Sequence, residues 1–276
     1  MKAPRTSVNR QLAIGLALLV AVGAALVALA GAAPQRFPGG FRDGANDAAP
    51  DMPYRGNTPY DGQFVFIRLR YDAGLRMRRP PWSHDYPRGE LHFAKILNEI
   101  TLVRPRLDGS NVLGLDDPEL FNHPLAYMAE PGFWTMTEKE CQNFRAYLKK
   151  GGFVIFDDFR ELEGAWVNLQ EQMRRVLPEA RWIEIDDGKH PIWHSFFEIP
   201  NPRALAPPPI YDQSMVLTYW GIFEDNDPSK RLIAVANVNN DISEYWEWSG
   251  TGFAPVSLDN EAYKYGINYF IYGLTH

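Results

Sequence analysis

Acidic side chains gather where short apolar runs end. Asp157 and Asp158 follow one such run, Arg70 and Asp72 follow an earlier one, and Glu130 follows a third. If the runs are strands, these side chains lie where ligands of open α/β sheets bind, at the carboxyl ends of the strands. They would line a carboxylate-rich pocket for a cation or a hydroxyl-rich ligand. The alternative is that one aspartate caps the next helix while the other is solvated.

A second candidate is the loop that follows the first expected strand. It brings together Trp82, His84, Asp85 and Tyr86. Aromatic, imidazole and carboxylate groups on one loop are suited to form the wall of a site, which makes Asp85 and Tyr86 candidate ligand-binding residues. The alternative is that Asp85 caps the next helix and Trp82 covers the edge of the core.

Two histidines, His190 and His194, have a spacing that would place both on one face of a helix, where they could bind a metal. Pro191 disfavours helical geometry at His190. A third ligand would have to come from elsewhere, the candidates being Asp186, Asp158 and His84. The alternative is one histidine bonded in the core and the other exposed. Because structural zinc needs four identifiable ligands, the sequence predicts no bound metal and no cofactor, and both histidines remain candidate ligand-binding residues.

An amide-rich segment, Asn239-Asn240-Asp241, follows an expected strand and precedes several tryptophans. Side-chain amides beside tryptophans suit sugar recognition, which makes Asn240 and Asp241 candidate ligand-binding residues. The favoured alternative is a turn followed by an aromatic lid.

Composition and missing motifs exclude several classes of function. The chain has 28 basic and 34 acidic residues, a net charge of -6, which argues against nucleic-acid binding. A single cysteine, Cys141, excludes disulfide frameworks and multi-cysteine metal sites. The sequence contains no G-x-S-x-G elbow, G-x-G-x-x-G fingerprint or P-loop, so it gives no support for Ser-His-Asp catalysis or for nucleotide binding by those routes.

The elements that must position these residues alternate between short apolar runs and helical periods, as in an α/β sheet. Strands are expected at 64–67, 125–128, 153–156, 182–185, 215–222 and 232–238. Helices are expected at 90–103, from the capping box of Thr137 and Glu140 to Gly151, at 166–176 and at 258–274. The pattern predicts a three-layer, doubly wound α/β domain over residues 63–276.

The amino-terminal region predicts export. Residues 1–33 combine Lys2, Arg5 and Arg10 with a long apolar run and small residues, as in a signal peptide or a transmembrane anchor. Either would leave the basic residues inside and place the domain outside the cytoplasm, in the periplasm or anchored to the inner membrane. Residues 34–62, rich in Pro, Gly, Asp and Asn, predict a flexible linker.

The domain resembles the family called domain of unknown function 4159, in the glutamine-amidotransferase-like superfamily. The resemblance rests on seven stretches: 64–71, 85–87, 151–159, 173–176, 190–194, 239–241 and 265–268. It implies a flavodoxin-like sheet, here preceded by the amino-terminal hydrophobic helix, and a bacterial envelope setting. Active members of that superfamily carry a Cys or Ser nucleophile after a Gly-Gly-led central strand. Here Asp157 and Asp158 follow that strand, and Cys141 lies within the preceding helix, so cysteine-dependent amidotransfer is not expected.

The leading expectation is therefore a non-catalytic envelope module that binds a ligand or a protein. Its partner would be an envelope or membrane protein, or a glycan. If residues 1–33 remain uncleaved, they would also bind the membrane. The alternative is a metal- or carboxylate-dependent hydrolase of cell-wall or other glycan material. Its candidate residues would be Asp85, Asp157, Asp158, His190 and His194.

Overall fold

The computed structural model describes residues 56–74, 79–161 and 164–276. The expected signal or anchor and most of the expected linker lie outside the described residues. All described residues fall within one compact unit, Asp43–His276. Among them, no helix is both long enough and apolar enough to cross a membrane.

Seven strands form one mixed sheet in the order β2-β1-β3-β4-β7-β6-β5. Strands β2, β1, β3, β4 and β7 are parallel, whereas β6 runs antiparallel to both β7 and β5. The strands are β1 Ile67–Arg70, β2 Asn111–Gly114, β3 Leu125–Ala129, β4 Phe153–Phe159, β5 Trp182–Glu184, β6 Thr218–Phe223 and β7 Leu232–Val238. The parallel strands therefore end at a common edge.

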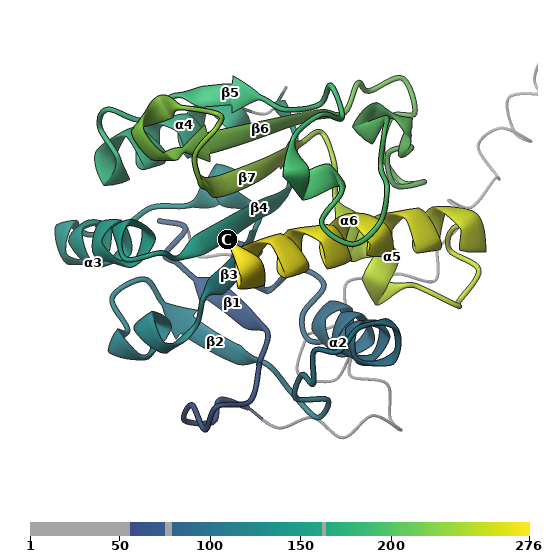
Figure 1. Ribbon diagram of the computed structural model, residues 1–276, viewed down its shortest axis with the longest axis horizontal. Coiled ribbons are helices and arrows are strands. Elements are labelled where there is room, and N and C mark those ends of the chain that lie inside the picture. Colours follow the sequence, from purple (N-terminus) through teal and green to yellow (C-terminus); the bar gives the residue numbers. More distant parts are fainter. Residues whose placement is uncertain (1–55, 75–78, 162–163) are drawn as a thin grey trace, which may run out of the picture. The chain divides into compact units, whose positions relative to one another are not determined.

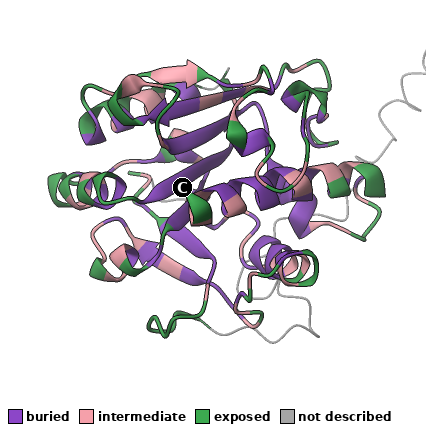
Figure 2. Ribbon diagram, viewed as in Figure 1, coloured by how far each residue is buried: buried purple, intermediate pink, exposed green. Residues whose placement is uncertain are grey.

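Helices cover both faces of the sheet (Figure 1). The α-helices are α2 Arg88–Ile100, α3 Glu138–Lys149, α4 Ala165–Val176, α5 Ile242–Glu247 and α6 Val256–Thr275. One core joins α3 and α4 to one face, and a second core joins α2, α5 and α6 to the other. Figure 2 shows the strands between these layers as mostly buried. The predicted α/β class is confirmed, with helices on both faces.

Short 3-10 turns connect these elements. They are η1 Pro81–Ser83, η2 Pro118–Asn122, η3 Pro131–Phe133, η5 Pro191–Trp193, η6 Pro202–Ala204 and η7 Glu224–Asn226.

Local signals explain the central β3-α3-β4 unit. Thr137 and Glu140 form the predicted capping box at the start of α3, and Gly151 takes a positive φ of 120° after its end. All seven residues of β4 are buried, as expected of a strand covered by helices on both sides. Asp157 and Asp158 are thus carried into the interior at the end of a central strand.

Two elements differ from the sequence prediction. Strand β2 was not predicted, and α5 replaces the expected turn and aromatic lid after Asp241. Its aromatic residues Tyr245 and Trp246 are buried rather than exposed. Along the outer edge of β2, the Asn57 side chain exchanges two 2.7 Å hydrogen bonds with the Val112 backbone. Residues 56–62 are mostly exposed and include this contact.

Candidate functional site

Three segments that are far apart in the sequence meet at the carboxyl edge of the sheet. His84 and Asp85 come from the β1–α2 loop, Asp158 from the end of β4, and Asp241 from the β7–α5 junction. Each offers one ligand atom, and the four atoms all lie within 4.8 Å of one another. This His84–Asp85–Asp158–Asp241 set is called the primary cluster below.

The primary cluster is centred on the His84 ring. His84 Nδ1 lies 2.7 Å from Asp158 Oδ2, 3.3 Å from Asp85 Oδ1 and 4.0 Å from Asp241 Oδ2. The three aspartates are buried, whereas the His84 side chain is 23% exposed. Solvent therefore reaches the cluster from the histidine side.

Despite these short approaches, three atoms of the cluster lack a hydrogen bond of acceptable geometry to any described residue. They are His84 Nδ1, Asp85 Oδ1 and Asp158 Oδ2, and all three are buried. Buried polar atoms without partners are costly, and most are satisfied by protein, water or an ion. Two carboxylate oxygens and a ring nitrogen that face one another in this way form the donor set of a cation site.

A network of hydroxyl groups holds the carboxylates in place. The Ser243 hydroxyl lies 2.5 Å from Asp85 Oδ2 and 3.1 Å from Asp241 Oδ1. The Tyr127 hydroxyl lies 2.7 Å from both Ser243 Oγ and Asp157 Oδ2. These bonds connect the β1–α2 loop to β3, β4 and α5, so the primary cluster is fixed by the core rather than by flexible loops.

Asp157 stabilises this arrangement from inside the fold. Its carboxylate accepts the side-chain amide of Asn237 and the backbone N–H groups of Ile242 and Ser243 at the start of α5. Each of these bonds is 2.9–3.2 Å long. Asp157 thus supports the start of α5, and it does not cap the helix that follows its own strand, α4, whose N-cap is Gly164.

Two further contacts position the other aspartates. The Tyr211 hydroxyl donates to Asp158 Oδ1 at 2.9 Å. Asp241 caps α5 by accepting the backbone N–H of Glu244 at 2.9 Å. Asp158 Oδ1 and Asp241 Oδ1 are therefore engaged, while Asp158 Oδ2 and Asp241 Oδ2 face His84.

A buried ion pair fixes the loop that carries His84. Arg68 on β1 pairs with Glu90 on α2 and also donates to the backbone carbonyls of Trp82 and His84, at 3.0 and 2.8 Å. Burial opposes the charged forms of this pair, and their mutual attraction sustains them. The guanidinium thus holds the loop against the sheet and leaves Asp85 to face the cluster.

A second acidic group adjoins the first. Asp85, Glu244 and Glu247 also place ligand atoms within 4.8 Å of one another, and all three are buried. Glu130, at the end of β3, is close enough to Asp158 for its charge to affect Glu130. Glu130, Glu244 and Glu247 thus add three carboxyl groups to the surroundings of the primary cluster.

This crowding shifts the pKa values of the glutamates upward. Burial and the charge of Asp85 raise the pKa of Glu244 to about 9 and that of Glu247 to about 8. Burial and the charge of Asp158 raise the pKa of Glu130 to about 8. Burial also raises the pKa of Asp157 to about 7. Shifts of this kind are typical of functional sites, and also of structural ion-pair networks.

The histidine and its neighbour shift in the directions expected of an ion pair. Burial alone would lower the pKa of His84, but the carboxylates of Asp85 and Asp158 outweigh it and raise that pKa well above its ordinary value. Burial alone would raise the pKa of Asp85, but the His84 charge and hydrogen bonds hold it well below its ordinary value. Burial and the charge of Asp158 raise the pKa of Asp241.

Backbone strain also gathers at this edge. Asp85, Glu130, Asp158 and Asn239 are non-glycine residues with positive φ, at 60°, 46°, 59° and 64°. Such conformations cost free energy and persist where the surrounding structure enforces them, which is common at active and ligand-binding sites.

The sequence matches the family described as Domain of unknown function (DUF4159) over residues 65–274. This chain belongs to the DUF4159 family. The match covers every strand and nearly all of α6, so the primary cluster lies entirely inside the DUF4159 domain. A search among curated proteins gives no match.

The structure of this DUF4159 domain brings together three of the predicted candidates, Asp85, Asp158 and Asp241. Asn240 lies beside them, where its side chain accepts the Asp241 N–H at 2.9 Å and donates to the Tyr219 hydroxyl at 3.2 Å. Tyr86 is half-buried and packs edge-on to Trp82. Asp85 does not cap α2 through its side chain, because that helix begins without a side-chain cap.

Three predicted candidates lie apart from the primary cluster. Arg70 is exposed at the end of β1, and its charge acts on Asp116. His190 caps η5 in an extended conformation, as Pro191 predicted, and packs against Phe223. His194 bonds to the Gly188 carbonyl at 2.6 Å and to Glu198.

The sequence analysis did not select four residues that the structure places at the site. Glu130 was expected at the strand-end pocket and His84 was named as a possible third metal ligand, but neither was among the final candidate ligand-binding residues. Glu244 and Glu247 had been assigned to an aromatic lid. Their three-residue spacing is the signal that could have placed them on one face of a short helix.

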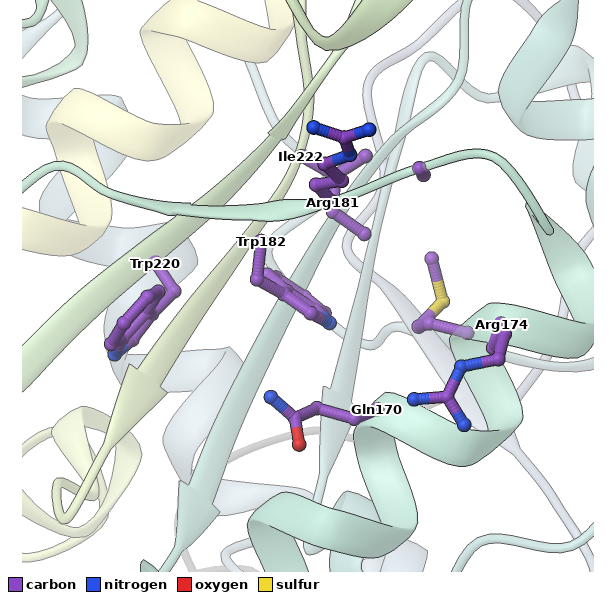
Figure 3. Close-up of a pocket in the computed structure, with 8 residues that line it drawn as sticks. Gln170, Arg174, Arg181, Trp182, Trp220 and Ile222 are labelled. Carbon is purple, nitrogen blue, oxygen red and sulfur yellow. The ribbon is translucent and has the colours of Figure 1, made fainter.

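One cavity of the described domain lies away from the primary cluster. Its volume is about 240 Å³, and it lies between α4 and the antiparallel strands β5 and β6. Figure 3 shows Gln170 and Arg174 on the helix facing Trp182 and Trp220 on the strands. Its lining residues include no carboxylate, histidine or cysteine side chain, and the two charged residues among them are arginines. Chemistry therefore favours the crowded carboxyl edge over this cavity.

Proposed function

We propose that the domain binds a divalent cation at the primary cluster and uses it to hydrolyse a substrate. One observation carries the proposal: Asp85 Oδ1 and Asp158 Oδ2 are buried, lack a partner among the described residues, and face the same histidine nitrogen. This proposal differs from the expectation, made from the sequence, that no metal is bound. The four residues come from three segments that are far apart in the sequence, and the order of the strands in the sheet brings them together.

The donor set narrows the cation. Three carboxylates favour hard ions, whereas the imidazole of His84 favours Mn²⁺, Fe²⁺ or Zn²⁺ over Mg²⁺ and Ca²⁺. A cation between these groups would replace the repulsion among the aspartates by attraction. It would require neutral His84, so binding would release the His84 proton.

The hydrolytic role rests on Glu130. A divalent cation lowers the pKa of a bound water toward neutrality, so that hydroxide forms near pH 7. Glu130 is a half-buried residue with a positive φ near Asp158, and its raised pKa suits it to accept and return a proton. The proposed reaction adds water across the scissile bond, with Glu130 taking the water proton and delivering it to the leaving group.

A glycan is the proposed substrate. The rings of Trp82 and Tyr86 lie in the same loop as His84 and Asp85, with centroids 6.1 Å apart, and aromatic faces of this kind stack on sugars.

We further propose a cell-envelope location, with the domain outside the cytoplasm and anchored or exported by residues 1–33. The strand order β2-β1-β3-β4-β7 is consistent with the flavodoxin-like pattern and supports the proposed kinship with amidotransferase-like folds.

A second candidate function is a non-catalytic module for a protein or glycan partner, with the cation in a structural role. The burial of Asp85 and Asp241, both 0% exposed, favours this candidate because it restricts the approach of a substrate.

The test begins with metal content. The full-length chain, purified in detergent without a histidine tag or chelator, should bind Mn²⁺ or Zn²⁺ in elemental analysis. Asp158→Asn and His84→Gln should weaken Mn²⁺ binding more than tenfold, whereas Glu171→Gln, on the exposed side of α4, should leave it unchanged.

Activity then separates the two candidates. Release of reducing ends from purified cell-wall glycan, abolished by chelator and by Asp158→Asn, supports the hydrolase. Bound cation without such release supports the module. A parent that binds neither ion above the level of His84→Gln contradicts both.

A further inference from the structure

The second acidic group, Asp85, Glu244 and Glu247, adjoins the primary cluster through a shared residue. Asp85 belongs to both groups. Its Oδ1 lies 3.3 Å from His84 Nδ1, while Oδ2 lies 2.5 Å from the Ser243 hydroxyl at the start of α5. The Asp85 carboxylate is therefore a member of both the primary cluster and the second acidic group.

The other members of the second group lie together on α5. Glu244 and Glu247 are three residues apart and therefore share a face of that helix. They are only 5% and 6% exposed, and both carboxyl groups approach the Asp85 carboxylate within hydrogen-bonding range.

Three buried carboxyl groups in contact need a positive partner or a shared proton. Arg68 does not supply one, because it is engaged with Glu90 and with the backbone of the His84 loop. Asp85 Oδ1 is fully buried and has no hydrogen bond from the described part of the chain. This buried oxygen is therefore available as a ligand for a cation.

We infer that Asp85, Glu244 and Glu247 form a second divalent-cation site, so that Asp85 bridges two ions in a binuclear centre. This inference rests on the proposed function of the primary cluster and deepens it. Paired ions about 3.5–4 Å apart are used by hydrolases to stabilise both the attacking and the leaving oxygen. The second ion has an all-oxygen ligand set, which suits Mn²⁺ or Mg²⁺.

The experiment counts ions and tests their coupling. The full-length chain in detergent is saturated with Mn²⁺, freed of unbound ion by gel filtration, and measured by elemental analysis and low-temperature electron paramagnetic resonance. We expect two Mn²⁺ per chain and an exchange-coupled spectrum, because the two ions share Asp85. Glu244→Gln and Glu247→Gln should each reduce the count to one and remove the coupling, while Glu171→Gln should retain both.

The outcomes distinguish this inference from the proposed function. One Mn²⁺ in the parent, unchanged in Glu244→Gln and Glu247→Gln, overturns the second site and leaves the first intact. No bound Mn²⁺ overturns both. Two uncoupled ions that survive both substitutions place the second ion elsewhere and also overturn the inference. The count and the exchange coupling in the parent together decide the matter even where a variant fails to fold.

Discussion

Single residues at the carboxyl edge combine burial, like charge and backbone strain. Asp85 and Asp158 have all three: they are buried, they face other carboxylates, and their φ values are positive. Each property lowers the stability of the folded chain unless something offsets it. Such a concentration of cost at one edge is characteristic of sites selected for function at the expense of stability.

His190 lies apart from the candidate site, and its protonation affects the stability of the fold. Burial, together with the nearby His276, lowers the pKa of His190 to about 4. The unfolded chain therefore binds a proton at His190 more readily than the folded chain. The resulting stability is fully present above about pH 6.5 and falls as the pH drops toward 4.

We expect His190→Asn to reduce this acid sensitivity. Asparagine retains a cap acceptor for the Ile192 N–H, which His190 Nδ1 accepts at 3.2 Å, and removes the titrating group. Between pH 6.5 and 4, urea unfolding should show the parent losing about 1–2 kcal/mol more than the variant, a value reduced for partial exposure.

His194 is the matched control. Its pKa is raised by the Gly188 carbonyl and Glu198, so His194→Asn should change the pH dependence in the opposite direction. Equal acid slopes in the parent and His190→Asn would contradict the assignment.

At the scale of elements, α5 connects the core to the candidate site. This six-residue helix carries Glu244 and Glu247 on one face and the core residue Trp246 on another. Trp246 packs against Phe93 of α2, with ring centroids 4.5 Å apart. Changes in the core beneath α5 should therefore reach the carboxylates.

Gly266 on α6 offers a direct test of this connection. An added Cβ would lie 2.4 Å from Trp246 Cζ2 and 2.6 Å from Phe93 Cε2, so a methyl group must displace one of them. We expect Gly266→Ala to lower the free energy of unfolding by about 1–3 kcal/mol despite the better helix propensity of alanine, as measured by chemical denaturation. The affinity for Mn²⁺ should fall as well.

Gly56→Ala is the control, because its new methyl would meet no atom within 4 Å. It should change stability by less than about 0.5 kcal/mol. A stable Gly266→Ala protein with parental Mn²⁺ binding would show that α5 tolerates movement of Trp246.

Elements with local signals could be predicted from the sequence, and those with distant partners could not. The start of α3 depends on Thr137 and Glu140, three residues apart, and was predicted. The start of α5 depends on Asp157, which accepts the N–H of Ile242 from 85 residues away. Strand β2 contains only four residues, including Asn111 and Gly114, and lacks an apolar run.

The candidate site follows the same division. Asp158 and Asp241 were selected because each follows an expected strand, and Asp85 because its loop combines aromatic, imidazole and carboxylate groups. His84 was named only as a possible third ligand beside His190 and His194, since its approach to Asp158 depends on β1, β3 and β4 lying side by side. His190 and His194 had metal-like spacing, but the turn at Pro191 gives them separate partners.

At the scale of the whole molecule, location is the property that most restricts function. Residues 1–33 predict export, and the proposed cell-wall glycan substrate would lie outside the cytoplasm. We expect the full-length protein to fractionate with the membrane or periplasm of its native cell, and a chain lacking residues 1–33 to remain in the cytosol. Immunoblotting of cell fractions checks both, and full-length protein in the cytosolic fraction would refute export.

The primary cluster draws its ligands from three segments that only the folded sheet brings together. An unfolded chain therefore has no preformed site and no selectivity among metals. Affinity for divalent ions generally follows a fixed order, so which ion is acquired depends on the ions available when the site closes. The identity of the proposed cation would thus be decided by the compartment in which the protein folds, and not by the compartment in which it is synthesised.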